Sequence, residues 1–356
     1  MVEESDGLAK SVLVGISGGV DSAVTAAILK EQGYRVEGLY LRNGFPAGSE
    51  DDAAAVASSL GLPLHIRDVA PSFRREIVDY FAREYLAGRT PNPCIVCNKK
   101  IKFRYLLDEA RARGLDCIAT GHYARVEEIG DTVEYALFKG VDREKDQSYF
   151  LFQLGQEELR RLLFPNGDRT KREIREMAGR LGLPSRKESQ EICFIPDDNY
   201  RSFLETCPSP LPRPGTIVDR EGTVVGRHKG THTVTIGQRK GLNIASPRPY
   251  YVLAIDTERD EVIVGREEDQ FAPGLVAKDC SWISAAGAPA GVLRARTHIR
   301  YRHRGVDSEI TPLPEGKVEV RFMTPQKAVA PGQAAVFFQG DRLLGGGWIE
   351  RGLRDA

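Results

Sequence analysis

The chain has 356 residues, of which 41% are hydrophobic and 28% charged, as in ordinary globular proteins. These values exclude a largely disordered chain, a fibrous repeat and a disulfide-stapled miniprotein, and the length predicts two to three domains. The 50 basic and 50 acidic residues balance to a net charge of zero, which argues against non-specific coating of nucleic acid. No run approaches the ~18 apolar residues of a membrane span. The polar, acidic N-terminus is not a secretory signal, and six sparse cysteines favour a reducing, cytoplasmic location.

The first part of the chain alternates expected strands and helices. Strands are expected at residues 11–17, 34–41, 64–69 and 117–120, and helices at 22–32, 50–60, 72–86 and 98–113. This repetition favours right-handed crossovers and a doubly wound parallel sheet with helices on both faces. We therefore expect an α/β domain over residues 1–207.

The character of the sequence changes at a proline-rich segment, residues 207–214 (CPSPLPRP), which reads as a stiff linker. Short β-type runs separated by Gly and Pro follow, among them TIVD, TVVG, HTVTIG, YYVLAID and EVIVG. A second break occurs near residues 271–275 (FAPGL). We expect a small β-rich domain over residues 208–273 and a C-terminal β-barrel over residues 274–356.

The sharpest local signal is SGGVDS at residues 17–22, directly after the first expected strand and directly before a helix. Its glycines allow backbone N–H groups to approach a ligand, and the helix N-terminus adds further donors and a positive dipole. It is not a Walker loop, because the sequence GK[ST] is missing. It resembles the PP-loop of ATP pyrophosphatases, and the resemblance implies ATP and Mg²⁺ as cofactors. The loop alone does not identify the molecule that accepts AMP.

Cys94 and Cys97 form a C-x-x-C pair, and Cys193 follows about a hundred residues later. By itself the pair can be a zinc site, a redox dithiol, a set of cluster ligands or a coincidence. A helix expected to begin near Asn98 would place Cys97 at a helix N-terminus. Three lysines also follow closely, Lys99, Lys100 and Lys102. Both effects would lower a thiol pKa, so we expect reactive thiols.

Several further motifs carry a resemblance that covers about residues 11–350. In chain order they are SGGVDS, GRTPNPxxxCNKxIKF, TGHYAR, KDQSYFLF, ICFI, TIGQRKGL and PGQAAVFF with GGGWI. In this order they resemble the tRNA-specific 2-thiouridylases of the MnmA type. The resemblance implies a tRNA-uridine 2-sulfurtransferase that acts on the wobble uridine, position 34. ATP would adenylate the uridine oxygen, and sulfur from a cysteine persulfide would then displace AMP.

The resemblance also assigns roles to residues. Cys193 matches the persulfide cysteine and Cys97 the nucleophile. The ATP-binding positions match Gly15, Ile16, Ser17, Gly18, Gly19, Val20, Asp21, Ser22, Leu41 and Gly121. Asn92, Pro93 and Cys94 match the stretch that meets the target base. Positions that touch the tRNA match His122, Lys145, Asp146, Gln147, Arg300, Tyr301 and Gln333. The implied partners are a tRNA with a wobble uridine and a sulfur donor, either a cysteine desulfurase or a sulfur-relay protein.

Cys94 is a departure, because many members of the family have Asp at this position. Two accounts of the sulfur step therefore stay open. In one, Cys193 carries a persulfide and a Cys97–Cys193 disulfide is left behind. In the other, Cys94, Cys97 and Cys193 ligate a [4Fe–4S] cluster whose fourth iron binds sulfide. The extra soft ligand at position 94 favours the cluster.

The segment 294–304 (RARTHIRYRHR) holds five arginines and no acid, and its alternation predicts arginines on one face of a strand. A solvated strand edge is the ordinary explanation. A second acid-free basic stretch at residues 222–255 favours phosphate contacts instead. Tyr301, His122 and Tyr123 are candidates to stack on an extruded base.

Two rival functions remain. One is a PP-loop ligase acting on a small metabolite, which would explain the ATP loop but not the cysteines or the basic β segments. The other is a tRNA-binding module with structural zinc at Cys94, Cys97, Cys193 and His122. AMP formation that depends on tRNA separates the first rival from a thiolase, and metal analysis with an ATP turnover assay separates the second.

Overall fold

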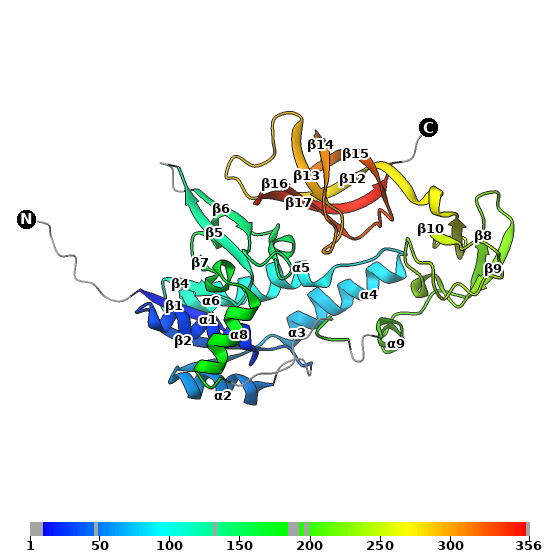
Figure 1. The fold of residues 1–356 in the computed structure, drawn as a ribbon. Coiled ribbons are helices and arrows are strands. Elements are labelled where there is room, and N and C mark those ends of the chain that lie inside the picture. Colours follow the sequence, from blue (N-terminus) through cyan, green and yellow to red (C-terminus); the bar gives the residue numbers. More distant parts are fainter. Residues whose placement is uncertain (1–9, 46–48, 131–133, 184–191, 196–198, 354–356) are drawn as a thin grey trace, which may run out of the picture.

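A computed structural model shows a parallel-sheet domain, a barrel packed against it and a small sheet at the far end of a long helical segment (Figure 1). It describes residues 10–45, 49–130, 134–183, 192–195 and 199–353. Residues 1–9 of the expected first domain and residues 354–356 of the last lie outside this range. Within it, no helix is both long enough and apolar enough to cross a membrane.

The expected doubly wound sheet is confirmed as five parallel strands in the order β3-β2-β1-β4-β7. Their bounds are β1 Ser11–Gly15, β2 Arg35–Arg42, β3 Leu64–Asp68, β4 Cys117–Ala119 and β7 Leu162–Leu163. Side chains of β1 alternate between two cores. Leu13 packs with Leu106 of α6 on one face, whereas Val12 and Val14 pack with Val24 of α1 on the other. This two-sided burial explains why β1 is apolar along its whole length.

The helices of this domain are α1 Val20–Glu31, α2 Glu50–Leu60, α3 Ala70–Phe73, α4 Asp79–Leu86, α5 Pro93–Cys97, α6 Arg104–Ala112, α7 Gln156–Leu159, α8 Lys171–Arg180 and α9 Tyr200–Glu205. Two π-helical segments, Arg74–Val78 and Asn98–Phe103, join α3 to α4 and α5 to α6. The helical backbone is therefore continuous from Pro93 to Ala112. Our expectation of a helix start near Asn98 is wrong by five residues, because Pro93 has the fixed φ suited to the first helical position.

The C-terminal barrel is confirmed. Its six strands are β12 Phe271–Trp282, β13 Leu293–His298, β14 Val306–Leu313, β15 Lys317–Lys327, β16 Ala334–Gln339 and β17 Arg342–Gly352. They follow the order β12-β15-β14-β13-β16-β17, and pairing of β12 with β17 closes the barrel. A hairpin of the first domain, β5 Ala124–Ile129 and β6 Glu134–Lys139, extends the same sheet by pairing β6 with β17.

The barrel and the parallel-sheet domain also share a core. Phe338 and Val336 of β16 belong to the same buried cluster as Leu13 of β1 and Phe103 of the π segment. The barrel therefore sits directly over the α5–α6 helical segment (Figure 1). No local pattern of the sequence predicts this contact.

The small central sheet has the order β10-β11-β8-β9. Its strands are β8 Gly215–Val218, β9 Val224–His228, β10 Tyr251–Asp256 and β11 Glu261–Gly265. We expected a strand in the run HTVTIG at residues 232–237, and this expectation is wrong. A 3₁₀ turn occupies Thr231–Thr233, and residues 234–237 form no strand. Its apolar residue Val234 still packs in the core of this domain.

Candidate active site

The candidate site lies where the strand order of the parallel sheet reverses, between β1 and β4. Ligands of open α/β sheets bind outside the carboxyl ends of the strands at such a point. The SGGVDS loop follows β1, and the segment from Thr120 to His122 follows β4. Both line one cavity of about 1620 Å³. Gly121 lies against the loop so closely that a Cβ there would come within 2.8 Å of the Asp21 carbonyl carbon.

The PP-loop itself is held by hydroxyl groups. Ser22 Oγ donates to the Gly19 carbonyl at 2.9 Å and lies 3.3 Å from Ser17 Oγ. Gly18 has a φ of +77°, a backbone conformation that other residues rarely adopt. No side chain caps α1 at Gly19, so the first N–H groups of that helix are left for an anion. Gly15, Ile16, Val20 and Leu41 also line the cavity.

A buried lysine from a distant helix reaches this loop, and sequence analysis missed it. Lys171 Nζ donates to Asp21 Oδ1 at 2.7 Å, although the two residues are 150 positions apart. The hydroxyl of Tyr123 donates to the same oxygen, also at 2.7 Å. Asn166 Nδ2 donates to the backbone carbonyl of Asp21 at 3.1 Å. The signal that could have revealed Lys171 is a basic residue at the first position of a helix, where acids are favoured.

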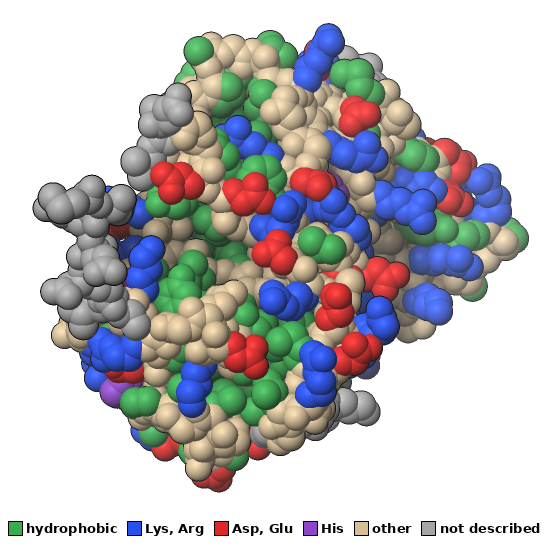
Figure 2. All heavy atoms as spheres, turned by 60° about the vertical axis from the view of Figure 1, so that its left-hand side comes forward, with side chains coloured by type: hydrophobic (Ala, Val, Ile, Leu, Met, Phe, Trp, Pro, Cys, Tyr) green, Lys and Arg blue, Asp and Glu red, His purple; other side chains and the backbone are tan. Residues whose placement is uncertain are grey.

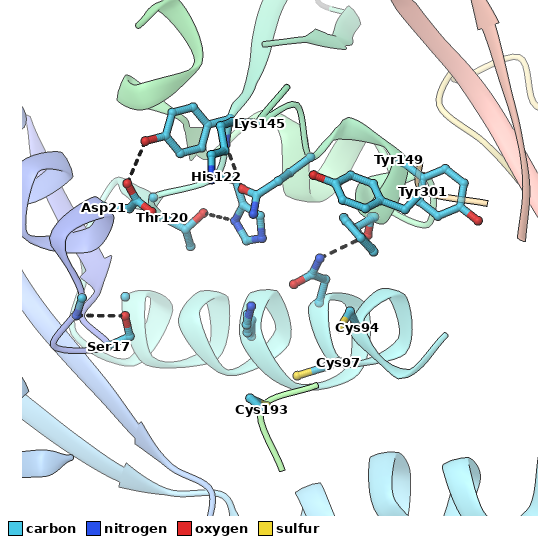
Figure 3. A pocket seen from close by; sticks show the side chains of 18 of the residues that line it. Ser17, Asp21, Cys94, Cys97, Thr120, His122, Lys145, Tyr149, Cys193 and Tyr301 are labelled. Atoms are coloured by element: carbon cyan, nitrogen blue, oxygen red, sulfur yellow. Dashed lines mark hydrogen bonds between the residues drawn. The ribbon is translucent and has the colours of Figure 1, made fainter. Parts of the chain in front are cut away.

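The three cysteines line the other end of the same cavity. Cys94 lies in the first turn of α5, Cys97 lies one turn later, and Cys193 faces the helix from a separate segment beside Cys97 (Figure 3). Cys97 is buried, whereas Cys94 and Cys193 are exposed. All three are free thiols. The three residues that the sequence predicts to act together therefore line one cavity.

The expected lowering of the thiol pKa values is wrong. Desolvation by the surrounding protein raises the pKa of Cys94 to about 11 and that of Cys97 to about 12, and it also raises the pKa of Cys193. This holds although the side chains of Cys94 and Cys193 are exposed at the cavity. Lys102 opposes this effect on all three but does not overcome it. The other two expected lysines point elsewhere, because Lys99 pairs with Glu158 and Lys100 with Glu76. The thiols are therefore neutral at physiological pH in this conformation.

The side chains around the thiols do not provide a metal site. Among the residues the structure describes, no three side chains of His, Cys, Asp or Glu are close enough together to hold a metal ion. The thiols as placed do not form a [4Fe–4S] site, and they do not form a zinc site with His122. His122 is instead 9% exposed, lies between Phe103 and Phe164, and has its Nδ1 2.7 Å from Thr120 Oγ1.

Several residues expected to touch tRNA have internal partners. Asp146 accepts hydrogen bonds from the backbone of Gly140 and from Ser148, and Gln147 Oε1 accepts one from the Tyr123 N–H. Tyr123 is buried against the PP-loop, so our expectation that it stacks on a base is wrong. Lys145 lines the cavity with them.

The target-base stretch is fixed by its neighbours. The Asn92 side chain hydrogen-bonds the Tyr149 hydroxyl, which itself donates to the Ala334 carbonyl at 3.0 Å. Gln333 donates from Nε2 to the carbonyl oxygens of Thr90 at 3.1 Å and Pro91 at 3.3 Å. Pro93 and Gln333 both line the cavity.

The arginine segment divides into two parts, contrary to expectation. Strand β13 ends at His298, so Arg300, Arg302 and Arg304 lie in the loop that follows and line the cavity. Arg294 and Arg296 stay on the strand and pair with Glu309 and Asp307 at 3.0 and 3.4 Å.

The two histidines of this segment also add less positive charge than the sequence suggests. Burial lowers the pKa of His298 to about 4 and also lowers that of His303, so neither adds positive charge at neutral pH. On the face in Figure 2, basic and acidic side chains are interspersed and do not form one basic surface. The arginines that face the cavity are therefore better placed than those on the strand to bind a phosphate. Tyr301, between them, packs against Phe150 with ring centroids 4.5 Å apart.

Three family models match consecutive parts of the chain. A family model described as a tRNA methyl transferase HUP domain matches residues 10–197, which is more than half of the chain. A model described as a tRNA methyl transferase PRC-barrel domain matches residues 202–266, and one described as an aminomethyltransferase β-barrel domain matches residues 272–349. A tRNA-specific 2-thiouridylase of Syntrophus aciditrophicus is 52% identical over 339 residues, covering 89% of this chain and 99% of that protein.

The chain belongs to the tRNA-specific 2-thiouridylase family. Similar proteins of this name occur in Geobacter metallireducens, at 47% identity over 97% of this chain and 98% of that protein, and in Carboxydothermus hydrogenoformans, at 46% identity over the same shares. The family resemblance expected from the motifs is confirmed. In this thiouridylase family member, the strand-reversal point, the PP-loop and the three thiols occupy one cavity.

Proposed function

We propose that this chain catalyses ATP-dependent 2-thiolation of the wobble uridine of tRNA and releases AMP and pyrophosphate. One observation carries the proposal: a single cavity contains both the PP-loop and the thiols of Cys94, Cys97 and Cys193. An ATP-activating loop and sulfur-carrying groups in one cavity fit a reaction in which sulfur replaces an adenylated oxygen. The names of the relatives support tRNA as the substrate.

The first half of the proposed reaction uses the PP-loop end. The backbone N–H groups of Gly18 and Gly19 and the uncapped start of α1 would bind the phosphates of ATP. Uridine O2 attacks the α-phosphorus, the bond to the β-phosphate breaks, and pyrophosphate leaves with the electron pair. Asp21 is the loop carboxylate that would hold Mg²⁺ with the phosphates, and Mg²⁺ would supply neutralising charge for them. Uridine O2 becomes a good leaving group because it now carries AMP.

The second half uses the thiol end. We propose that a cysteine desulfurase or sulfur-relay protein first loads a persulfide onto Cys193, which is exposed and accepts it. The terminal sulfur attacks C2 of the uridine, and AMP leaves. Cys97 then attacks Sγ of Cys193, the persulfide S–S bond breaks, and its electron pair stays with the sulfur on the base. The products are a thiocarbonyl and a Cys97–Cys193 disulfide, which a thiol reductant must open before the next turnover.

The proposed reaction needs no [4Fe–4S] cluster, and the described side chains do not converge on a metal position. The exposed Cys94 is left without a required role in the two-cysteine reaction. Its substitution therefore distinguishes this route from the cluster route.

The deciding experiment incubates purified protein with ATP and a tRNA transcript that carries U34, and measures AMP and pyrophosphate with and without the tRNA. AMP formation that needs the tRNA, together with a 2-thiouridine in the digested product, is the expected result. ADP release would overturn the PP-loop chemistry. AMP formation with small metabolites and no tRNA would favour the ligase alternative.

A further inference from the structure

We propose that Lys171 is a positioning residue that, together with Tyr123, holds the carboxylate of the PP-loop Asp21 for the AMP-forming step. This inference rests on the proposed function and adds a residue that the PP-loop motif does not contain. It starts from a geometric fact. Lys171 Nζ and the Tyr123 hydroxyl both donate to Oδ1 of Asp21 at 2.7 Å, and no described residue donates to Oδ2. The carboxylate is thus fixed through one oxygen and leaves the other for the cavity.

The position of Lys171 is itself held by the fold. Lys171 is the first residue of α8, and Thr170 caps this helix by accepting a hydrogen bond from the Glu173 N–H. The backbone N–H of Lys171 donates to Asp142 Oδ2 at 2.9 Å. The neighbouring Asn166 binds the backbone carbonyls of both Asp21 and Gly121. The start of α8 is therefore attached to the PP-loop and to the segment after β4. The backbone of Lys171 is held in place by these contacts, and its ammonium is held by the bond to Asp21.

Lys171 departs from one local preference. A cation at a helix N-terminus opposes the helix dipole, which favours acids there. The residue is also only 5% exposed, and its burial is compensated by the pairing with Asp21. Sites that break local rules are the sites where function is expected. The position of this cation beside the PP-loop therefore supports a role in the reaction there.

The chemistry at the loop explains why a cation is useful. A Walker loop contains its own lysine, whereas SGGVDS contains none. Negative charge develops on the departing pyrophosphate, and groups fixed in advance stabilise such charge best. Lys171 contacts Asp21, 150 residues away along the chain, and holds its carboxylate in place. We therefore expect Lys171 to affect the reaction by positioning the Asp21 carboxylate.

The test compares four single variants of the full chain. Lys171→Met removes the charge at similar length, Tyr123→Phe removes only the hydroxyl, and Asp21→Asn keeps an acceptor. Arg172→Met is the matched control, because Arg172 follows Lys171 on α8 but is 81% exposed and pairs only with Glu176 among the described residues. The readouts are the rate of tRNA-dependent pyrophosphate release, the KM for ATP, ATP binding by calorimetry and the melting temperature.

Lys171→Met is expected to lower kcat on the order of tenfold or more, with little change in KM for ATP or in ATP affinity. Tyr123→Phe should lower kcat by less, and Arg172→Met should match the wild type. Adding Lys171→Met to Asp21→Asn should cause no further loss, because the two residues act as a unit. The wild-type protein is measured in the same assay. If it forms no AMP, the proposed function itself fails, whereas a difference between wild type and variants tests only the role of Lys171.

Three outcomes would overturn the inference. Losses that multiply in the double variant would mean that Lys171 contacts the phosphates directly. A lowered melting temperature with normal kcat would mean that the ion pair only stabilises the fold. If Lys171→Met does not fold, Lys171→Arg and Tyr123→Phe decide instead, and wild-type kcat in both would reject a positioning role.

Discussion

The side-chain amide of Gln333 donates to the carbonyl oxygen of Thr90 at 3.1 Å, so the C-terminal barrel holds the loop that leads into the cysteine helix. The Thr90 N–H also donates to the Pro331 carbonyl at 2.8 Å. Gly332 permits this approach, because a Cβ there would lie 3.0 Å from the Thr90 carbonyl oxygen. The position of Cys94, four residues after Thr90, thus depends on a different domain.

This contact predicts the effect of Gln333→Met, which removes the amide at similar volume. Thiolation at saturating tRNA should fall, because the loop before α5 loses two hydrogen bonds and the thiols lose their fixed position. The tRNA Kd should change little. Single-turnover thiolation and filter binding measure the two effects. A raised Kd with a normal single-turnover rate would instead support the direct tRNA contact that the family resemblance implies for Gln333.

Replacing Asp21 should affect stability as well as turnover. Asp21→Ala leaves the buried ammonium of Lys171 without this carboxylate, and such a loss costs up to about 3 kcal/mol. Asp21→Asn keeps an oxygen that accepts from Lys171 and Tyr123, so it should be the more stable of the two. Urea unfolding gives the difference, and pyrophosphate release should be impaired in both. Equal stability of the two variants would mean that the Asp21 acceptor contributes little to the fold.

The division of the arginine segment gives a matched pair of variants. Arg302→Ala should weaken tRNA binding and reduce the salt slope of log K by roughly one unit, because Arg302 lines the cavity and no described acid pairs with it. Arg294→Ala should leave both unchanged, since Glu309 already neutralises that guanidinium. Binding isotherms at several salt concentrations test this difference. The same slope change in both variants would show that position in the cavity does not matter.

The raised thiol pKa values predict how alkylation depends on pH. For a pKa of about 11, the thiolate fraction of Cys94 rises about tenfold per pH unit between pH 7 and 9. Iodoacetamide labelling of the Cys94 peptide, followed by mass spectrometry, should rise in parallel without a plateau. Lys102→Met should slow labelling further, because Lys102 lowers this pKa. A plateau below pH 9 would show that the thiol is activated rather than suppressed.

Cys94→Ser decides between the two accounts of sulfur transfer. Because the described thiols do not converge on a metal position, we expect this variant to retain thiolation with no iron bound. Protein purified and reconstituted anaerobically with iron and sulfide provides the comparison, with absorbance and single-turnover thiolation as the readouts. Loss of both a cluster spectrum and activity in Cys94→Ser would establish the cluster route. Cys97→Ala and Cys193→Ala should be inactive under either account, so they serve only as inactive controls.

The sequence by itself determined the elements and the chemistry that depends on neighbours along the chain. The apolar run of β1 and the glycines of SGGVDS predicted a buried strand followed by an anion-binding turn, because both properties are local. The expected helix over residues 50–60 matches α2, whose Ser49 cap and Gly61 end are also local signals. The motif order was sufficient to predict the thiouridylase family.

The tertiary structure decided the electrostatics and the partners of each side chain. Local charge predicted low thiol pKa values, yet desolvation by the surrounding protein raises them. The spacing of residues 294–304 predicted equivalent arginines, yet the strand ends at His298 and only the later ones face the cavity. Lys171 reaches Asp21 across 150 residues, and no local pattern specifies that contact. Desolvation and long-range pairing depend on which segments pack together, and the local patterns of this sequence do not contain that information.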